Sequence, residues 1–213
     1  MAKLMTLRTF IAVPLSSEQE ENLAATERRL QREVPAGTVR WVKPANIHIT
    51  LHFLGDVLQE RIPSIEQALE SVTRLMPAFT CRLAGMGTFP NMRRPRVIWV
   101  GVQDTGNRLE LLYTALGEAL ATIGFQPERR PFSPHLTLGR VSRRATAAEI
   151  QDLSSVLRQT DIGDLGPLPI QEVILFRSDL TPSGPIYAPL ARHTLATPPA
   201  TSARSQGESS AAR

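Results

Sequence analysis

The sequence has little of several features on which other classes of protein depend. It contains one cysteine, Cys81, so an intrachain disulfide is excluded and a reducing compartment is favoured. No apolar run approaches the roughly 20 residues needed to span a bilayer, and the apolar run at residues 10–15 is too short for a signal peptide. Aromatic residues make up only 5% of the chain, so we expect a core of Leu, Val, Ile and Ala. We predict a cytoplasmic globular protein in which Cys81 is a packed core residue.

Positive charge is in modest excess, because Lys and Arg outnumber Asp and Glu to give a formal net charge of +4 over 213 residues. That length is enough for one sizeable domain or two small lobes. The excess suits a polyanionic partner, although each arginine cluster alone fits a solvated basic face equally well. The clusters, of which the last two bracket His135, are Arg93, Arg94 and Arg96; Arg129 and Arg130; and Arg140, Arg143 and Arg144.

Hydrophobic periodicity and capping residues predict an alternation of strands and helices. Helices are expected from Ser16 or Ser17 to about residue 33, over 59–75, over 107–123, and from Thr146 to about residue 158. Ser17 and Glu20 have the spacing of a capping box. Thr146 and Glu149 have the same spacing. Strands are expected at residues 6–15, 39–42, 47–54, 79–83, 96–102, 135–141, 172–177 and 186–190.

The end of the chain has a different composition from the rest. Residues 196–213 contain no large apolar side chain and are rich in Pro, Ser and Ala. Such a segment buries too little apolar surface to offset the entropy of ordering it, so we predict a disordered tail. Residues 1–195 are then expected to form one domain.

The sequence also has the form of an internal duplication. His48 and His135 lie 87 residues apart, and the same offset carries the strand at residues 10–13 onto residues 97–100. The two helices of the first half then fall on two helices of the second half. Each half reads strand, helix, His-x-Thr-x strand, helix. This order suggests a pseudo-two-fold arrangement around a shared cleft.

The two histidines each open a tetrad of the same kind. Residues i and i+2 of a strand point to the same face, so each histidine projects together with its threonine while the apolar residues project into a core. Two such tetrads with apolar flanks arise by chance in about one sequence in a thousand. The tetrads are His48-Ile49-Thr50-Leu51 and His135-Leu136-Thr137-Leu138.

Two imidazoles and two hydroxyls at one site suit phosphodiester chemistry. With an unperturbed pKa of about 6.5, one imidazole can be neutral and act as a base on water while the other is charged and protonates the leaving oxygen. Threonine hydroxyls can donate to the non-bridging phosphate oxygens, where charge accumulates in the transition state. This scheme requires no metal and no cofactor. The spacing alone does not say whether His48 or His135 is the acid.

The remaining histidines fit this pattern less well. His193 is not followed by a threonine two positions on. His52 is expected on the same strand face as His48, as a neighbour of the cleft rather than a catalyst. On a strand those two rings would be roughly 13 Å apart at about 3.3 Å per residue, too far to share a metal ion.

These motifs resemble those of the 2H phosphoesterase superfamily, and within it the RNA 2′,3′-cyclic phosphodiesterase or 2′-5′ RNA ligase family. The likeness extends to about Leu195. His52 departs from the small residue expected at its position, and the tail is an addition. The matching segments are Arg8-Thr9-Phe10-Ile11-Ala12-Val13; Asn46-Ile47-His48-Ile49-Thr50-Leu51-His52-Phe53-Leu54-Gly55; and Arg130-Pro131-Phe132-Ser133-Pro134-His135-Leu136-Thr137-Leu138-Gly139-Arg140.

The resemblance implies an α+β fold with two pseudo-symmetric lobes, each an antiparallel sheet with two outer helices, around a central cleft. It implies hydrolysis of a 2′,3′-cyclic phosphate at an RNA end to a 2′-phosphate, with reversible, ATP-independent 2′-5′ ligation as a side activity. By this likeness His48 is the proton donor to the leaving 3′ oxygen and His135 is the acceptor that activates water. RNA ends, tRNA fragments among them, are the expected partners. We expect a monomer and no membrane partner.

The resemblance also suggests a set of substrate-binding residues. Arg140 would contact the phosphate or lie over the terminal base, with Phe10 as a stacking partner, although core packing explains Phe10 equally well. Leu136 and Leu138 are included in this set, although strand alternation points their side chains inward. For Arg130, a salt bridge or a role in ordering a loop is favoured over substrate contact.

Two other functions remain open at this point. The arginine clusters also fit a module that binds RNA ends with negligible turnover, although a pure binder has no need of both histidines and both threonines. A protein whose physiological direction is 2′-5′ ligation would use the same site, so the residues do not separate joining from hydrolysis.

Overall fold

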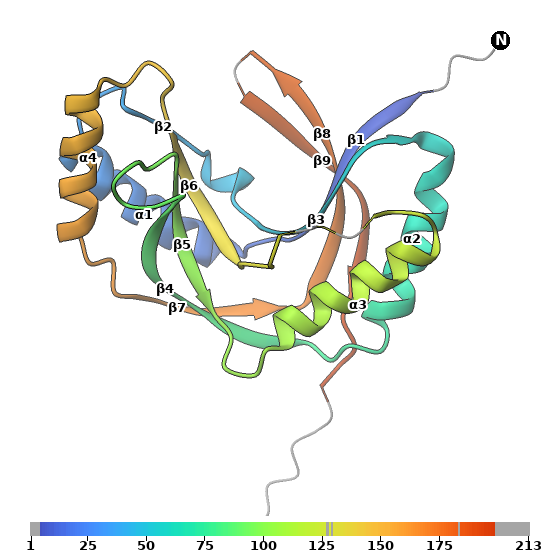
Figure 1. Cartoon of the computed structure of the whole chain (residues 1–213). Coiled ribbons are helices and arrows are strands. Elements are labelled where there is room, and N and C mark those ends of the chain that lie inside the picture. The colour runs from blue at the N-terminus through green and yellow to red at the C-terminus, as the bar shows by residue number, and fades with distance from the viewer. Residues whose placement is uncertain (1–4, 127, 129, 183, 199–213) are drawn as a thin grey trace, which may run out of the picture.

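A computed structural model of the chain describes residues 5–126, 128, 130–182 and 184–198. The elements alternate as the periodicity predicts (Figure 1). In chain order they are β1 (Thr6–Val13), α1 (Ser17–Glu33), β2 (Val39–Trp41), η1 (Pro44–Asn46), β3 (Ile49–Leu58), η2 (Gln59–Arg61), α2 (Ile62–Thr73), β4 (Phe79–Phe89), β5 (Val97–Gln103), α3 (Arg108–Thr122), β6 (His135–Val141), α4 (Ala147–Gln159), β7 (Asp164–Ile170), β8 (Glu172–Thr181) and β9 (Gly184–Thr194).

The strands form one antiparallel sheet that is divided at its centre. Its order is β7-β4-β5-β6-β3-β1-β8-β9. The short strand β2 pairs with the end of β6, on the side opposite β5. β6 and β3 are joined through the single pair Ile49 and Leu136, whereas the other neighbours share longer ladders. The sheet therefore consists of two half-sheets that meet at a narrow seam, which confirms the predicted two lobes.

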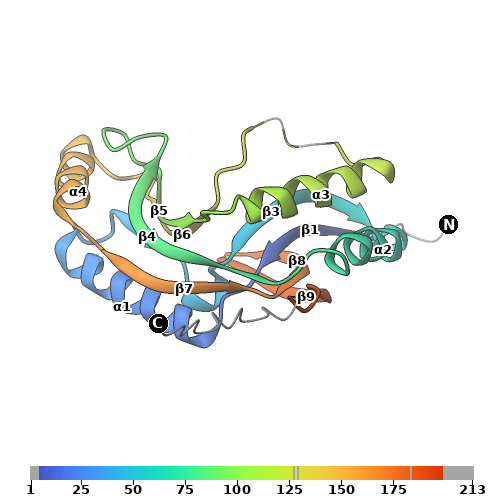
Figure 2. The same ribbon diagram turned by 90° about the horizontal axis from the view of Figure 1, so that it is seen from below.

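Each half-sheet is covered by one helix from each half of the sequence. α2 and α3 pack on each other and cover the β3-β1-β8-β9 half-sheet, whereas α1 and α4 lie beside the β7-β4-β5-β6 half-sheet (Figures 1 and 2). α1 follows β1 in the chain but lies on the opposite lobe, and α3 follows β5 in the same way. The lobes are therefore not consecutive segments, although each has the two outer helices that were expected.

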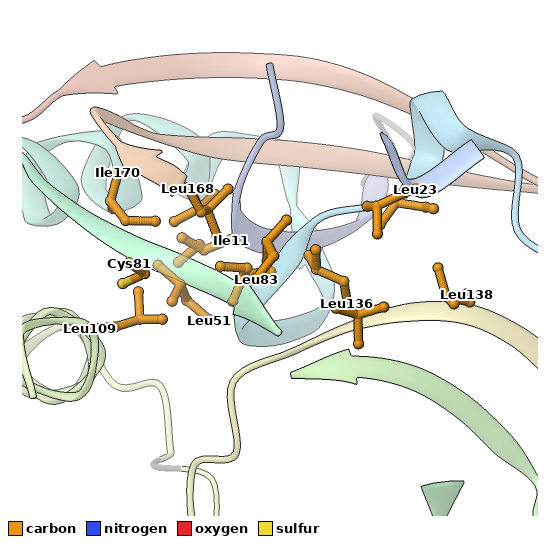
Figure 3. Close-up of a cluster of buried hydrophobic side chains, with 14 of the residues drawn as sticks. Ile11, Leu23, Leu51, Cys81, Leu83, Leu109, Leu136, Leu138, Leu168 and Ile170 are labelled. Atoms are coloured by element: carbon orange, nitrogen blue, oxygen red, sulfur yellow. The ribbon is translucent and has the colours of Figure 1, made fainter. Parts of the chain in front are cut away.

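Most of the buried side chains are aliphatic and form one cluster that continues across both half-sheets. Figure 3 shows Ile11, Leu83 and Leu136, which come from three different strands, packed into this core. Cys81 lies in the same cluster with 2% of its surface exposed, and burial raises the pKa of its thiol to about 12. A thiol in this state is neither accessible nor ionised at neutral pH, so the prediction of a packed core cysteine is confirmed.

The caps and strand ends differ in part from those expected. Ser16, not Ser17, caps α1, and Gln19 completes the capping box in place of Glu20. The predicted box of Thr146 and Glu149 is confirmed at α4. Strand β3 continues past Gly55, where it was expected to stop, because that glycine adopts a φ of +72° beside a register shift in the ladder with β1.

Strand β7 was not predicted from the sequence, because Pro167 and Pro169 interrupt its pattern. Both prolines lie opposite residues of β4, and β7 is an edge strand because it comes first in the sheet order. An edge strand has one side without a neighbour, so the missing proline N–H groups can face that side at little cost.

Backbone contacts with the domain continue slightly beyond its predicted end. Ala196, expected to open the disordered tail, forms a parallel bridge with Pro77, and its N–H donates to the carbonyl oxygens of Thr73 and Met76. Leu195 beside it is buried. The backbone is thus attached to the end of α2 through residue 196, while residues 199–213 of the predicted tail lie outside the described residues. No helix in the described ranges is long and apolar enough to cross a membrane.

Glu27 on α1 offers a test of the packing in this lobe. Its carboxyl group is buried, and burial raises its pKa from 4.5 to about 6, although the Gln31 side chain donates to it at 2.7 Å. A raised folded-state pKa costs stability once pH exceeds the unfolded value, so the penalty grows between pH 4.5 and 6. We expect Glu27→Gln to raise the free energy of unfolding at pH 7 by about 2 kcal/mol.

Urea unfolding at pH 7 and at pH 4 measures this difference. The gain should nearly disappear at pH 4, where the Glu27 carboxyl is mostly protonated in both the folded and the unfolded state. Glu21→Gln changes an exposed carboxylate on the same helix and serves as the matched control. Equal stabilities of the Glu27→Gln variant and the unmodified protein at pH 7 would contradict the buried charge.

Candidate active site

The two tetrads meet at the seam between the half-sheets. His48 immediately precedes β3, and His135 is the first residue of β6. Because Ile49 and Leu136 are paired in an antiparallel ladder, His48 lies across the seam from Thr137, and His135 lies across from Thr50. Ile49 and Leu136 are fully buried on the core side of the sheet, so the four polar side chains share the other face.

Both histidine rings are held in the same way. Nδ1 of His48 donates to the carbonyl oxygen of Asn46 at 2.9 Å, and Nδ1 of His135 donates to the carbonyl oxygen of Ser133 at 2.7 Å. A carbonyl oxygen can only accept, so each Nδ1 carries a hydrogen. Each Nε2 is therefore left to exchange a proton with a substrate. The repeated bond two residues upstream fixes both tautomers without a carboxylate partner.

His48 lies among aromatic side chains. Its ring stacks on Phe10 with centroids 4.8 Å apart, and Tyr187 meets it edge-on at 5.3 Å. Burial by these neighbours lowers the pKa of His48 to about 4, against a smaller raising effect of the bond to Asn46 and together with repulsion from His135. The neutral ring is therefore the stable form of His48 in the free protein at neutral pH.

His135 has a different aromatic environment. Phe89 meets its ring edge-on with centroids 4.9 Å apart, and Trp99 lies at 6.4 Å. The duplicated frame explains part of this arrangement, because Phe89 is paired with Val97 as Phe176 is paired with Phe10. The position of Phe10 is thus taken by a smaller valine in the second half. The two histidines are equivalent in backbone position but not in their surroundings.

Both tetrad strands contain a β-bulge just after the threonine. Ile11 pairs with His52 and Ala12 with Thr50, so Leu51 is left unpaired in β3. Leu138 is skipped in the same way where β6 pairs with β5. The extra residue reverses the alternation beyond it, so His52 is buried on the helix side of the sheet instead of on the face of His48. The expectation that His52 borders the site is therefore wrong.

The bulges bring two other side chains onto the face of the histidines. Phe53 is 67% exposed and lies 6.2 Å from Phe10 by ring centroids. Arg140 occupies the equivalent position in β6, is exposed, and lies near enough to Tyr187 to lower the pKa of that hydroxyl against the larger opposite effect of burial. Phe53 and Tyr187 were not identified from the sequence. The 87-residue offset between Phe53 and Arg140 was the one available signal for the phenylalanine.

Three predicted substrate-binding residues have to be corrected. Phe10 is 3% exposed and already stacked on His48, so its ring has no free face for a base. The side chains of Leu136 and Leu138 are fully buried in the core, where strand alternation directs them (Figure 3). Phe53 is exposed and Trp99 is half-buried, so both present aromatic surface on this face that a base can contact.

The buried His52 connects the two lobes' motifs through a stack of rings. It stacks on Tyr113 of α3 at 4.4 Å, and Tyr113 stacks on Phe132 at 4.2 Å. Its Nε2 donates to the Tyr113 carbonyl oxygen at 2.8 Å, and a Cβ at Gly117 would come within 3.1 Å of the ring. Phe132 is next to Ser133, whose carbonyl orients His135. The stack therefore anchors the loop that holds the second catalytic candidate.

This stack leads to a prediction about turnover. We expect His52→Ala to lower kcat by about tenfold with little change in KM, because the loop that holds His135 loses its anchor. His52→Phe retains the stacked ring and should recover most of the loss. Steady-state kinetics of both variants, with thermal unfolding as a check on folding, separate positioning from instability. Equal kcat values for the alanine variant and the unmodified protein would exclude a positioning role.

The assembled groups can perform acid–base chemistry on an anionic substrate. Two Nε2 atoms are available for proton transfer, and two threonines on the same face offer hydroxyls as hydrogen-bond donors. Within residues 5–126, 128, 130–182 and 184–198, no three His, Cys, Asp or Glu side chains come together as metal ligands would.

Comparison with known proteins agrees with the internal duplication of the chain. The family model described as LigT like Phosphoesterase matches the chain twice, over residues 13–99 and 100–187, with the offset that separates His48 from His135. An RNA 2′,3′-cyclic phosphodiesterase of Methanothermobacter thermautotrophicus is 34% identical over 183 residues, 86% of this chain and 96% of the relative. One of Thermotoga maritima is 34% identical over 185 residues, covering 85% and 91%.

Solved structures show the same fold. Escherichia coli LigT complexed with 3′-AMP superposes with a TM-score of 0.71 at 27% identity, covering 90% of this chain and 99% of that one. TT0787 of Thermus thermophilus superposes with a TM-score of 0.72 at 27% identity over the same shares. The repeated family match, the sequence relatives and the shared fold lead to one assignment. The chain belongs to the LigT-like phosphoesterase family.

Proposed function

We propose that this phosphoesterase hydrolyses the 2′,3′-cyclic phosphate at the 3′ end of RNA to a 2′-phosphate. The observation that carries the proposal is the pairing of two His-x-Thr tetrads across the Ile49–Leu136 seam, with both Nε2 atoms free. Relatives named RNA 2′,3′-cyclic phosphodiesterase, at 30–34% identity, support this substrate.

In the proposed reaction His135 and His48 act as base and acid, in the roles that the motif resemblance implies. Nε2 of His135 accepts a proton from water as the water oxygen attacks phosphorus. The bond from phosphorus to the 3′ oxygen breaks, and Nε2–H of His48 donates its proton to that oxygen. The hydroxyls of Thr50 and Thr137 donate to the non-bridging oxygens, whose negative charge increases in the transition state.

The low pKa of His48 places a condition on this assignment. An acid must be protonated, whereas burial keeps His48 neutral in the free protein at pH 7. A phosphodiester carries a full negative charge, and an opposite charge within ~4–6 Å favours the imidazolium form. Substrate binding is therefore expected to raise the pKa of His48 and to be accompanied by proton uptake.

Hydrolysis in the presence of a chelator tests the function and its independence of metal. Purified protein is incubated with an oligonucleotide that ends in a 2′,3′-cyclic phosphate, with and without EDTA, and the product is identified by its terminal phosphate. The proposal expects the same rate in both and a 2′-phosphate product. No hydrolysis without EDTA would overturn the function, and loss of activity only with EDTA would overturn metal independence.

The two alternatives give different results in the same experiment. Ligation of tRNA halves through a 2′-5′ bond would pass through the same groups in reverse, so rates of joining and of hydrolysis on matched RNA halves decide the favoured direction. A module that only binds RNA ends would retain the oligonucleotide without converting it. We also propose, as the sequence predicts, that the protein is cytoplasmic and monomeric. Sedimentation at working concentration tests the oligomeric state.

A further inference from the structure

A large groove opens on the lobe that carries His135. It has a volume of about 1810 Å³ and is bordered by β2, the turn before β5, the end of β6 and one side of α4 along its length. Seven arginines line it, and all seven side chains are exposed. They are Arg40, Arg93, Arg94, Arg96, Arg140, Arg143 and Arg158.

Among the residues that the structure describes, no carboxylate neutralises the charge of this groove. No Asp or Glu is among its lining residues, and within the described ranges none of the seven guanidinium groups forms an ion pair with a carboxylate. Glu149 at the start of α4 accepts hydrogen bonds from the backbone N–H and hydroxyl of Thr146 as part of the helix cap. Seven unpaired cations around one hollow repel each other, which favours a polyanionic occupant.

The groove is continuous with the candidate active site. Arg140 lies on the same strand as His135, five residues further on, or on the order of 16 Å at about 3.3 Å per residue. It is paired with Arg40 of β2 and with Val97 of β5, both of which line the groove. Its guanidinium group also acts on Tyr187, which meets His48 edge-on. Arg140 is therefore shared by the site and the groove.

The dimensions favour a polymer over a small anion. Pockets for small molecules occupy about 300–1,000 Å³, and this groove is larger. Arginines on four separate segments would be matched by phosphates repeated along a strand, each guanidinium binding one phosphate. If the 3′ end of a nucleotide strand is bound in the active site, the preceding nucleotides must extend away from it. The groove offers them a path, because it begins at Arg140, at the edge of the sheet face that carries the histidines.

We infer that the arginine groove binds the phosphates of the RNA strand upstream of the cyclic-phosphate end. This inference rests on the proposed function, because it takes the RNA end to lie between His48 and His135. The site holds the terminal nucleotide, and the groove holds the nucleotides that precede it. The protein should therefore prefer an oligonucleotide to a single nucleotide that carries the same end.

The test compares two substrates and two sets of variants. The substrates are a nucleoside 2′,3′-cyclic monophosphate and an oligoribonucleotide of about ten residues with the same end. The groove variant is R93A/R94A/R143A, which leaves Arg140 and the tetrads intact. The control variant, R28A/R32A/R74A, removes the same charge from exposed positions on α1 and at the C-cap of α2 that do not line the groove.

We expect the groove variant to raise KM for the oligonucleotide by about 30-fold at 50 mM salt and to leave KM for the mononucleotide unchanged. The slope of log affinity against log salt should become shallower by about 2, since each single-strand phosphate contact contributes about 0.7. The control variant should change neither. Oligonucleotide binding is also measured directly by fluorescence anisotropy, so the result does not depend on turnover.

The outcomes separate the groove from the function. Equal KM values and salt slopes for the groove variant and the unmodified protein would overturn the groove proposal, as would the same change in the control variant. If neither substrate is hydrolysed by the unmodified protein, the proposed function fails. Anisotropy with the oligonucleotide then still decides whether the arginine groove binds RNA.

Discussion

Replacing His135 by alanine is expected to lower kcat for cyclic-phosphate hydrolysis by about 10²–10⁴-fold, and replacing His48 by alanine should do the same. Each change removes one proton transfer from a site whose backbone pairing, through Ile49 and Leu136, is unaffected. The double variant should lose little more than either single variant, because the two groups act in one step. Single-turnover assays on an oligonucleotide measure the chemical step without product release.

A sulfur substitution in the substrate assigns the two roles. When the leaving 3′ oxygen is replaced by sulfur, the thiolate departs without needing a proton, because a thiol is acidic with a pKa of about 8.5. The defect of His48→Ala should then become much smaller, whereas the defect of His135→Ala should remain. The opposite pattern would exchange the donor and the acceptor. Rescue of neither variant would contradict a histidine acid at this site.

His193→Ala is a suitable control for these measurements. His193 lies on β9 opposite Val173, and it carries no threonine two positions on. Its replacement should leave kcat within about twofold of the unmodified protein, as a change outside a transition-state contact does. A loss as large as that of His135→Ala would mean that the tetrads do not define the site.

The second large effect is expected in the dependence of activity on pH. One imidazole must be neutral and the other protonated, so the rate should fall on both sides of an optimum. Because kcat/KM follows the ionisation of the free protein, its acid limb should lie near pH 4: once His48 also takes up its proton, both imidazoles are protonated and neither can accept a proton from water. An imidazole in water would place that limb near 6.5. For kcat the limb should move to higher pH, since bound phosphate favours the protonated ring.

The cause of the low pKa can be tested with Tyr187. Removing its ring by Tyr187→Ala admits water beside His48, so the acid limb of kcat/KM should shift toward 6.5. Tyr187→Phe retains the ring and should leave the limb in place. Imidazole ¹⁵N signals of the free protein, titrated from about pH 3 to 9, report the same ionisation without kinetics. An acid limb near 6.5 in the unmodified protein would show that burial does not control His48.

Several features of the molecule follow from local sequence alone. The tetrads place His and Thr on one strand face because side chains alternate in any strand, whatever packs against it. The box of Thr146 and Glu149 also forms between residues three positions apart, so it could be predicted without knowing the fold. The offset between His48 and His135 predicted a two-fold arrangement because a repeated sequence repeats its elements.

Other features depend on pairings that the sequence does not display. The skipped residue in each tetrad strand turns His52 to the helix side and exposes Phe53, and a strict period of two misses this because a bulge is fixed by the register with the neighbouring strand. Phe10 was a plausible base platform until its strand was placed between β3 and β8, where packing stacks the ring on His48.

The active site and the arginine groove differ in the same way. His48, Thr50, His135 and Thr137 were predicted together from the sequence, because each pair is local and the two pairs are copies. The distribution of the helices between lobes and the gathering of the seven arginines could not be predicted, since these contacts join segments that are far apart in the chain. The sequence by itself determined the chemical groups and their strands. The tertiary structure alone decided what surrounds them, because burial and long-range charge depend on which strands are neighbours.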